Sequence, residues 1–263
     1  MSTLLFEKRG FVATLTINRP ETRNALGEEG DGELFAEAAA RINADREVRC
    51  AILTGAGTAF SAGGNLKAMR EKSGVFAGTP DAIQHRYKGD IHRIILSLWN
   101  LEVPLIAAVN GPAIGLGNGV ACTADIRIAS TFASFGASFL KIGLVPGDGE
   151  AWTLARLIGP ARAAELFFTA KTIDAATALE WGLISRIVPP ELLMEEARGL
   201  ATEIARQPPG VLRMTKKLMR ESGGLEANLE KAVAFQARAH ASEDHAEALA
   251  AYFEKREPNF KGK

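Results

Sequence analysis

Apolar and polar positions follow two different periods along the chain, and these periods predict where strands and helices form. Residues 11–18 place Phe11, Ala13, Leu15 and Ile17 on one side, which is typical of a half-buried strand. Continuous apolar runs predict buried strands at 50–55, 104–110 and 125–130. All four predicted strands therefore lie in the first half of the chain.

Helical spacing fills the intervals between these strands and then the rest of the chain. A weak helix is expected within 27–45, because it contains three glycines that each cost about 1 kcal/mol relative to alanine. A second helix begins after Thr79, with an apolar stripe made of Ile83, Tyr87, Ile91, Ile94, Ile95 and Leu98. After about residue 149 the pattern is almost entirely helical. This order predicts an α/β fold with right-handed βαβ units, followed by a helical C-terminal region.

The composition indicates a globular protein without a strong electrostatic field. Lys plus Arg and Asp plus Glu number 31 each, so the formal net charge is zero and a nucleic-acid partner is not expected. No apolar run approaches the roughly 20 residues that span a bilayer, and the N-terminus lacks the features of a signal peptide. We therefore expect a cytoplasmic protein that does not bind membranes.

The cysteines and histidines give no sign of a metal site. Cys50 and Cys122 lie in apolar surroundings, which favours buried, reduced thiols. The four histidines are scattered over predicted helices. His240 and His245 are five residues apart, so they do not share a face of one continuous helix. No metal is expected.

Two glycine-rich segments, 55–65 and 110–120, each follow a predicted strand and lead into a predicted helix. Neither completes a dinucleotide-binding fingerprint, because the third glycine is replaced by Phe60 in one and by Val120 in the other. A phosphate-binding loop is absent too. Two interpretations remain: close packing that needs glycine, or backbone N–H groups at helix starts that bind a developing negative charge.

Several segments resemble, in order, the crotonase family, which is the enoyl-CoA hydratase/isomerase superfamily. The segments are NRPETRNAL (18–26), AFSAGGNLKAM (59–69), IAAVNGPAIGLGNGVACTADIRIAS (106–130), FGASFLKIGLVPGDGEAWTLARLIG (135–159), ALEWGLISRIVP (178–189) and FEKREPNFKGK (253–263). Together they cover essentially the whole chain. Any one of them alone would be a weak indication, but their shared order is highly specific.

The resemblance implies a fold and a class of substrate. It implies a ββα spiral core over 1–200 that binds an acyl-CoA thioester, and a helical region over 201–263 at the contacts between subunits. The assembly would be a trimer, often paired into a hexamer. The resemblance implies no tightly bound cofactor, since coenzyme A arrives as part of the substrate.

The resemblance also assigns roles to backbone and surface groups. The two N–H donors to the thioester oxygen would be those of Gly64 and Leu116. Residues at positions that contact coenzyme A in the family are Arg23, Ala25, Ala62, Lys67, Phe260 and Lys263, the last two from a neighbouring subunit. An ordinary solvated surface charge is the alternative for each Lys and Arg.

The two glutamates of the family's hydratases are missing. Matched position by position, they fall on Gly119 and Phe139, and neither side chain can transfer a proton. Asn118 is adjacent to the first of these positions but is a poor base. Phe139 would also occupy the space that water takes in a hydratase.

Asp148 and Glu150, in the run PGDGEAW, are the remaining candidate catalytic acids. The family's isomerases and a dehalogenase carry their acid at the position of Gly147, one residue earlier. Its β-diketone hydrolases share Pro-Gly-Asp-Gly with a catalytic aspartate that matches Asp148, but they use a histidine at the position of Phe139. The alternative is structural, because an Asp before a helix and a Glu in its first turn both favour helix formation.

An apolar acyl pocket would raise the pKa of Asp148 by desolvation. We expect this pocket to contain Phe135, Phe139, Leu144 and Trp152. One positioned acid then favours isomerisation of a double bond, or retro-Claisen cleavage of a carbon–carbon bond, over hydration by two carboxylates. Two alternatives stay open: an enoyl-CoA hydratase with atypical acids, and an acyl-CoA-binding protein that has lost catalysis.

Overall fold

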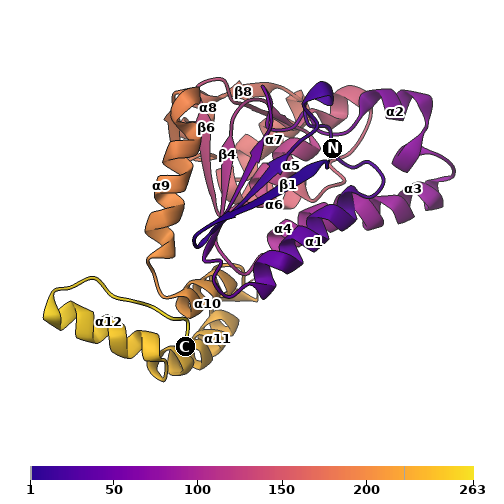
Figure 1. Cartoon of the computed structure of the whole chain (residues 1–263). Coiled ribbons are helices and arrows are strands. Elements are labelled where there is room, and N and C mark those ends of the chain that lie inside the picture. Colours follow the sequence, from indigo (N-terminus) through magenta and orange to yellow (C-terminus); the bar gives the residue numbers. More distant parts are fainter. Residues whose placement is uncertain (1, 222) are drawn as a thin grey trace.

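The computed structural model describes residues 2–221 and 223–263. Its centre is a six-stranded sheet in the order β1-β2-β3-β4-β6-β9, in which β1 is antiparallel to β2 and all other neighbours are parallel (Figure 1). The strands of this sheet are β1 (Leu4–Arg9), β2 (Val12–Ile17), β3 (Cys50–Gly55), β4 (Leu105–Val109), β6 (Ile126–Ser130) and β9 (Arg186–Val188). A second sheet is formed by β5 (Ala113–Ile114), β7 (Ser134–Gly136) and β8 (Thr172–Asp174).

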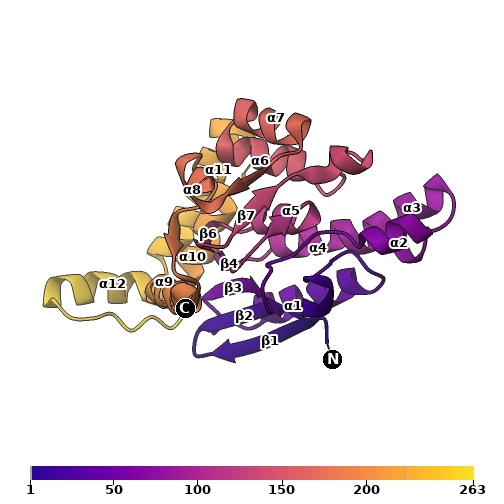
Figure 2. The same ribbon diagram turned by 90° about the horizontal axis from the view of Figure 1, so that it is seen from above.

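Helices cover both faces of the central sheet and continue beyond it (Figure 2). The α-helices are α1 (Asp31–Ala44), α2 (Leu66–Glu71), α3 (Pro80–Arg86), α4 (His92–Trp99), α5 (Leu116–Cys122), α6 (Glu150–Ile158), α7 (Pro160–Thr169), α8 (Ala175–Glu180), α9 (Leu193–Ala205), α10 (Pro209–Met219), α11 (Gly224–His240) and α12 (Glu243–Glu254). A π-helical turn, Tyr87–Ile91, joins α3 to α4. Short 3-10 helices are Pro20–Thr22, Gly74–Phe76, Ser138–Ile142 and Pro190–Leu192.

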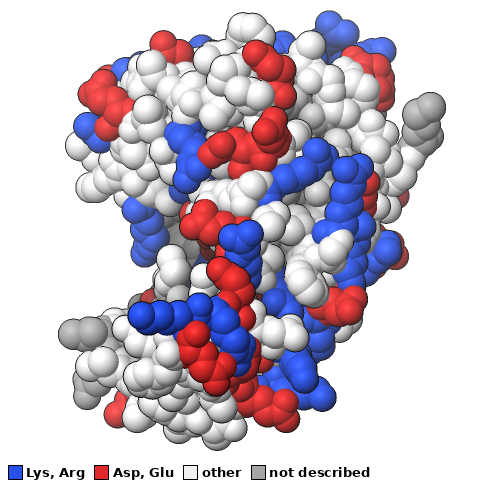
Figure 3. Space-filling model, turned by 60° about the vertical axis from the view of Figure 1, so that its left-hand side comes forward, with Lys and Arg blue, Asp and Glu red and all other residues white. Residues whose placement is uncertain are grey.

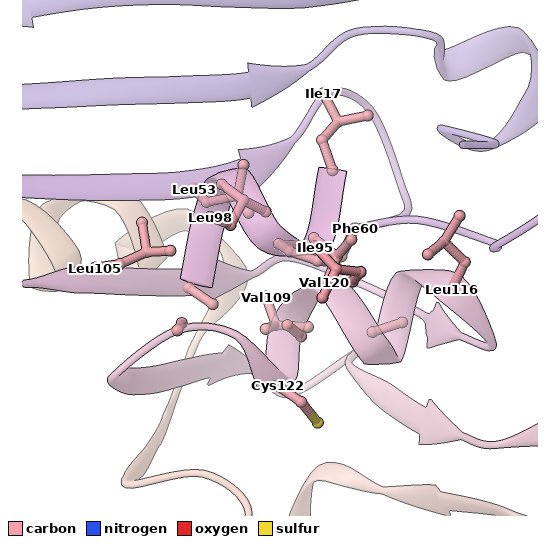
Figure 4. Packing of buried hydrophobic residues seen from close by; sticks show 14 of the residues in the cluster. Ile17, Leu53, Phe60, Ile95, Leu98, Leu105, Val109, Leu116, Val120 and Cys122 are labelled. Atoms are coloured by element: carbon pink, nitrogen blue, oxygen red, sulfur yellow. The ribbon is translucent and has the colours of Figure 1, made fainter. Parts of the chain in front are cut away.

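Alternation along the strands divides the core into two layers. In β3, Ala51 and Leu53 face the layer that holds α1, α4 and α5, whereas Cys50 and Ile52 face α9. Figure 4 shows the first layer, where Leu53 lies beside Leu98 of α4, and Leu116, Val120 and Cys122 of α5 belong to the same cluster. Because both faces are covered there, β3 and β4 are buried along their whole length and are mostly apolar, as their sequence predicts.

The predicted strands at 11–18, 50–55, 104–110 and 125–130 are confirmed as β2, β3, β4 and β6. Strand β1 was not predicted, although its residues alternate, and neither were the three-residue strands β8 and β9 within the region expected to be helical. The predicted boundary at residue 200 falls inside α9, whose buried Ala197 and Ala201 pack on the central sheet. Helix α10, after Ala205, also contacts the core, because Nζ of Lys216 donates to the carbonyl oxygen of Val103 at 2.8 Å. The division of the chain at residue 200 stays a prediction.

His240 and His245 do not share a face of one helix, as expected, but they lie in contact across a break between two helices. Helix α11 ends at His240 and α12 begins at Glu243, so the two residues do not belong to one helix. The change of direction brings Nδ1 of His240 within 3.1 Å of Nε2 of His245. Surface charges are mixed, as the zero net charge suggests: on the face shown in Figure 3, Lys and Arg side chains lie among Asp and Glu.

Candidate active site

The two glycine-rich segments converge at the start of α5. The N–H of Ile114 donates to the carbonyl oxygen of Ser61 at 3.0 Å. A Cβ atom at Gly117 would lie only 2.2 Å from that same oxygen, so glycine is needed for this approach. The N–H groups of Gly64 and Leu116 donate no hydrogen bond within the described part of the chain, and both residues line one cavity. Their N–H groups are free to bind a ligand atom.

This cavity has a volume of about 230 Å³ and a mostly apolar wall. Its apolar side chains include Met69, Phe76, Ile114, Phe139, Ile142 and Leu144. Asp148 reaches the wall from the turn before α6, and Tyr87 reaches it from the π-helical turn. A carboxyl group in such surroundings is removed from water without losing access to a ligand.

Asp148 fills the space that Gly119 leaves empty. A Cβ atom built on Gly119 would lie 2.3 Å from Oδ2 of Asp148, so no larger side chain fits beside this carboxyl in its present place. Gly119 belongs to α5 and Asp148 to the turn before α6, and these two helices pack against each other. The carboxyl therefore stands at the position where a side chain on α5 would otherwise project.

Burial raises the pKa of Asp148 to about 6. Its Oδ1 accepts a hydrogen bond from the backbone N–H of Glu150 at 3.1 Å, which opposes this increase. The turn is held from α4, where Nε2 of His92 lies 2.8 Å from the carbonyl oxygen of Gly147. Asp148 is thus a fixed group whose protonation changes close to neutral pH.

Glu150 lies behind Asp148 and does not reach the cavity. It is the first residue of α6, and its side chain is fully buried. Asn118 Nδ2 donates to Oε1 of Glu150 at 2.5 Å. Burial first, and then the charge of Asp148, raise the pKa of Glu150 well above its usual value. Because Glu150 is buried behind Asp148, it cannot contact a ligand in this cavity directly.

Of the six expected coenzyme A residues, Ala62 lines the cavity, and Arg23, Ala25 and Lys67 lie in segments next to cavity-lining residues. The N–H of Ala62 donates to the carbonyl oxygen of Arg23 at 2.9 Å, which joins the 18–26 segment to the cavity wall. Ala25 follows Arg23 in the same turn and is buried. Lys67 lies in the first turn of α2, exposed and without an ion pair in the described residues.

Phe260 and Lys263 lie at the other end of the sheet within this chain. The carbonyl oxygen of Phe260 accepts a hydrogen bond from Nη2 of Arg49 at 2.7 Å, and Arg49 immediately precedes β3. The cavity, in contrast, lies beyond the carboxyl end of β3. The tail therefore does not meet the cavity of its own chain, which leaves a contribution to a neighbouring subunit's site as a prediction.

Two expected pocket residues do not line the cavity. Trp152 is two positions after Glu150 and thus points to nearly the opposite side of α6. Its ring lies edge-on to Trp99, with a centroid distance of 5.4 Å, and the guanidinium of Arg156 covers it. Phe135 is fully buried in the core instead. Phe139 and Leu144 do line the cavity.

Sequence reasoning did not assign Tyr87, Met69, Phe76 and Ile142 to the cavity. The spacing places Tyr87 on an apolar helical stripe without a role in a site, and the π-helical turn that contains it has no sequence signature we recognise. Cys50 and Cys122 are buried free thiols, as expected. Among the described residues no group of three or more His, Cys, Asp or Glu side chains could hold a metal ion, and no helix is long and apolar enough to cross a bilayer.

Comparison with known proteins identifies the family. The family model described as "Enoyl-CoA hydratase/isomerase" matches residues 7–263. The chain belongs to this family. It is 36% identical to the short-chain-enoyl-CoA hydratase of Clostridium acetobutylicum, over 97% of this chain and 96% of the other. It is also 36% identical to the 1,2-epoxyphenylacetyl-CoA isomerase of Escherichia coli K12, over 96% and 95%.

The fold of this family member agrees with solved structures. The crystal structure of an enoyl-CoA hydratase from Bacillus anthracis superposes with a TM-score of 0.93 at 31% identity, covering all of both chains. The structure of DspI from Pseudomonas aeruginosa gives a TM-score of 0.91 at 27% identity, covering 99% and 97%. The protein therefore has the crotonase fold, and it is an enzyme of the enoyl-CoA hydratase/isomerase family.

Proposed function

We propose that this enzyme moves a proton within an acyl-CoA thioester, with Asp148 as its single acid–base group. The observation that carries this proposal is the carboxyl of Asp148 in the space beside Gly119, where it lines the cavity. One carboxyl can take a proton from one carbon and return it to another, which is the chemistry of double-bond isomerisation.

The thioester carbonyl would bind to the free N–H groups of Gly64 and Leu116. Removing a proton next to that carbonyl converts its oxygen to an enolate, and two N–H donors stabilise the new charge. Because both donors are backbone groups, the Leu116 side chain leaves the donor in place and narrows the cavity. Coenzyme A would extend past Arg23, Ala62 and Lys67, with no other cofactor required.

The apolar wall opposes ordinary hydration. Phe139 contributes to this wall at a position where the family's hydratases carry a glutamate, so no second carboxyl is available to activate water. Retro-Claisen cleavage is the second candidate, favoured by the Pro-Gly-Asp-Gly run at 146–149. Cleavage would need a water molecule beside Phe139, which the apolar wall does not favour. We therefore rank isomerisation first.

The test is exchange of carbon-bound protons with heavy water. The protein is incubated with a panel of acyl-CoA and enoyl-CoA thioesters, and deuterium uptake and products are followed by mass spectrometry. We expect uptake that Asp148→Asn slows by about a thousandfold and that Glu191→Gln, at an exposed carboxylate, leaves intact. Uptake that survives Asp148→Asn would overturn the assignment of the base.

The products of the same experiment separate the alternatives. A shifted double bond supports isomerisation, whereas a gain of one water identifies hydration and a shortened acyl chain identifies cleavage. Binding of a thioester without exchange or turnover across the panel would support a protein that binds acyl-CoA without catalysis. Trimeric or hexameric assembly, with the helices after Ala205 at the contacts, is a prediction that sedimentation analysis can check.

A further inference from the structure

Three unpartnered oxygen atoms meet between α5 and α6. Buried side-chain polar atoms without a hydrogen-bond partner in the described residues number five, and three of them are Asn118 Oδ1, Asp148 Oδ2 and Glu150 Oε2. The same three residues are joined by two hydrogen bonds, from Asn118 Nδ2 to Glu150 Oε1 and from the Glu150 N–H to Asp148 Oδ1. The concentration of unpartnered atoms at one place needs a physical cause, because buried oxygens normally have partners.

The cause is a shortage of hydrogen-bond donors around these three atoms. All three unpartnered atoms are acceptors, and an ionised Glu150 has no proton to offer them. A protonated Glu150 carries one O–H. A carboxylic acid and a side-chain amide each offer one donor and one acceptor, so the two groups can form a pair of hydrogen bonds. Asn118 already donates to Oε1, so a proton on Oε2 can donate back to Asn118 Oδ1. One proton then satisfies two of the three atoms and leaves only Asp148 Oδ2, which lies against Gly119 of α5.

The groups around Glu150 also oppose its ionisation. Within the described residues Glu150 has no ion pair. From α5 it faces Asn118 and Cys122, whose thiol pKa is raised by burial. On its own turn it faces Asp148, which can carry a negative charge. His92 of α4 acts on Asp148, not on Glu150. A buried carboxylate without a counter-charge is costly, so it takes up a proton instead.

We propose that Glu150 is a neutral carboxylic acid, bound to Asn118 through two hydrogen bonds, and that this acid–amide pair positions Asp148 as the only ionised carboxyl at the site. Its effect on catalysis rests on the proposed function, because it is exerted through Asp148. A second carboxylate this close would raise the pKa of Asp148 further and keep the base protonated at neutral pH. The neutral pair avoids this and anchors Asp148 through the Glu150 N–H.

The direct test is infrared spectroscopy of the protein at pH 8, where Asp148 is ionised. Glutamate labelled with ¹³C at its carboxyl identifies the carbonyl band of a protonated acid, and the Asp148→Asn background removes any contribution from Asp148. We expect a protonated-glutamate band that Glu150→Gln eliminates. Absence of that band, or its survival in Glu150→Gln, would overturn the proposal. This readout does not depend on activity, so failure of the proposed reaction leaves it interpretable.

Unfolding against pH provides a second readout. The pKa of Glu150 is raised in the folded state, so folding retains a proton that the unfolded chain releases above its ordinary pKa of 4.5. The stability that this proton contributes is complete below that pH and is lost as the pH rises towards the folded-state pKa. Glu150→Gln should remove part of this decline in melting temperature. An identical decline in the variant would contradict a neutral Glu150.

Kinetics distinguishes positioning from simple packing. Glutamine keeps both hydrogen bonds with Asn118, whereas alanine removes them. We expect Glu150→Gln to preserve the pH midpoint of proton exchange at a rate well above that of Glu150→Ala, which should fall about tenfold or more. A pH midpoint that drops by a full unit in Glu150→Gln would mean that Glu150 is charged in the wild type, against the proposal.

Discussion

Two aspartates, the partly buried Asp125 and the buried Asp148, respond to their surroundings in opposite ways. Asp125 lies 2.8 Å from Nζ of Lys216 and 2.6 Å from Nη2 of Arg220, and these cations keep its pKa below the usual value. Asp148 has no ion pair among the described residues, and burial raises its pKa to about 6. The neighbouring charges, rather than burial alone, decide whether a carboxyl is held ionised or can exchange a proton.

The two carboxyl groups accordingly have different roles in the molecule. Lys216 and Arg220 belong to α10 and the residue after it, so the Asp125 cluster attaches the C-terminal helices to the core. The Arg220 guanidinium also lies 3.6 Å from the ring centroid of Trp99. Asp148 instead lines an apolar cavity and has one buried carboxyl oxygen without a hydrogen-bond partner in the described residues. A paired carboxylate stabilises the fold, and an unpaired one costs stability in return for reactivity.

Among variants that keep the Asp148 side chain, one that crowds this carboxyl should reduce the rate of proton exchange most. Gly119→Ala places a methyl group 2.3 Å from the present position of Oδ2. We expect proton exchange to fall about a hundredfold, because a displaced acid loses its alignment. Alanine is a better helix former than glycine, so the variant should remain folded. Full activity in Gly119→Ala would show that the close contact is unimportant.

Asp125→Asn tests the paired carboxylate. The substitution leaves the buried Lys216 without its counter-charge, and we expect a loss of about 3 kcal/mol in the free energy of unfolding. Urea denaturation at pH 7 measures this, with Asp174→Asn, at an exposed helix cap, as a comparison of smaller effect. A neutral result would mean that the Asp125 cluster does not hold α10 in place.

Asp148→Asn should change stability in the opposite direction. The folded-state pKa of about 6 exceeds the ordinary value of 3.8, so the stability due to the proton is complete below pH 3.8 and is lost as the pH rises through 6. Asparagine does not ionise, so the variant does not lose this stability as the pH rises. At pH 8 we expect the variant to be more stable by about 3 kcal/mol, and at pH 3.5 the difference should vanish. Calorimetry at both pH values measures this difference in the free energy of unfolding, and an equal difference at pH 8 and pH 3.5 would contradict the prediction.

Lys67→Ala should cause the smallest change. An exposed charge near a bound phosphate contributes about 1 kcal/mol, so KM for an acyl-CoA should rise about fivefold with kcat nearly constant. Arg198→Ala, an exposed charge on α9, serves as the control. Equal effects of the two substitutions, or a fall in kcat, would remove Lys67 from the coenzyme A site.

Local sequence patterns predicted the main strands and the glycine-dependent turns because these depend on neighbours in the chain. Alternation fixed β2, and continuous apolar runs fixed β3 and β4. The place of Asp148 beside Gly119 depends on the approach of α5 to α6, which no local pattern records. Trp152 was misplaced because the start of α6 sets which way each side chain points. The contact between His240 and His245 likewise depends on a break between two helices.

The most direct measurement is the rate of deuterium uptake by a thioester substrate as a function of pH, for the wild type, Asp148→Asn and Asp125→Asn below their melting temperatures. A base must be ionised to accept a proton, so the wild-type rate should rise through a midpoint near pH 6, and folded Asp125→Asn should follow the same curve. Asp148→Asn should be slower by about a thousandfold with no such midpoint. Uptake by Asp148→Asn at the wild-type rate would show that this carboxyl is not the base.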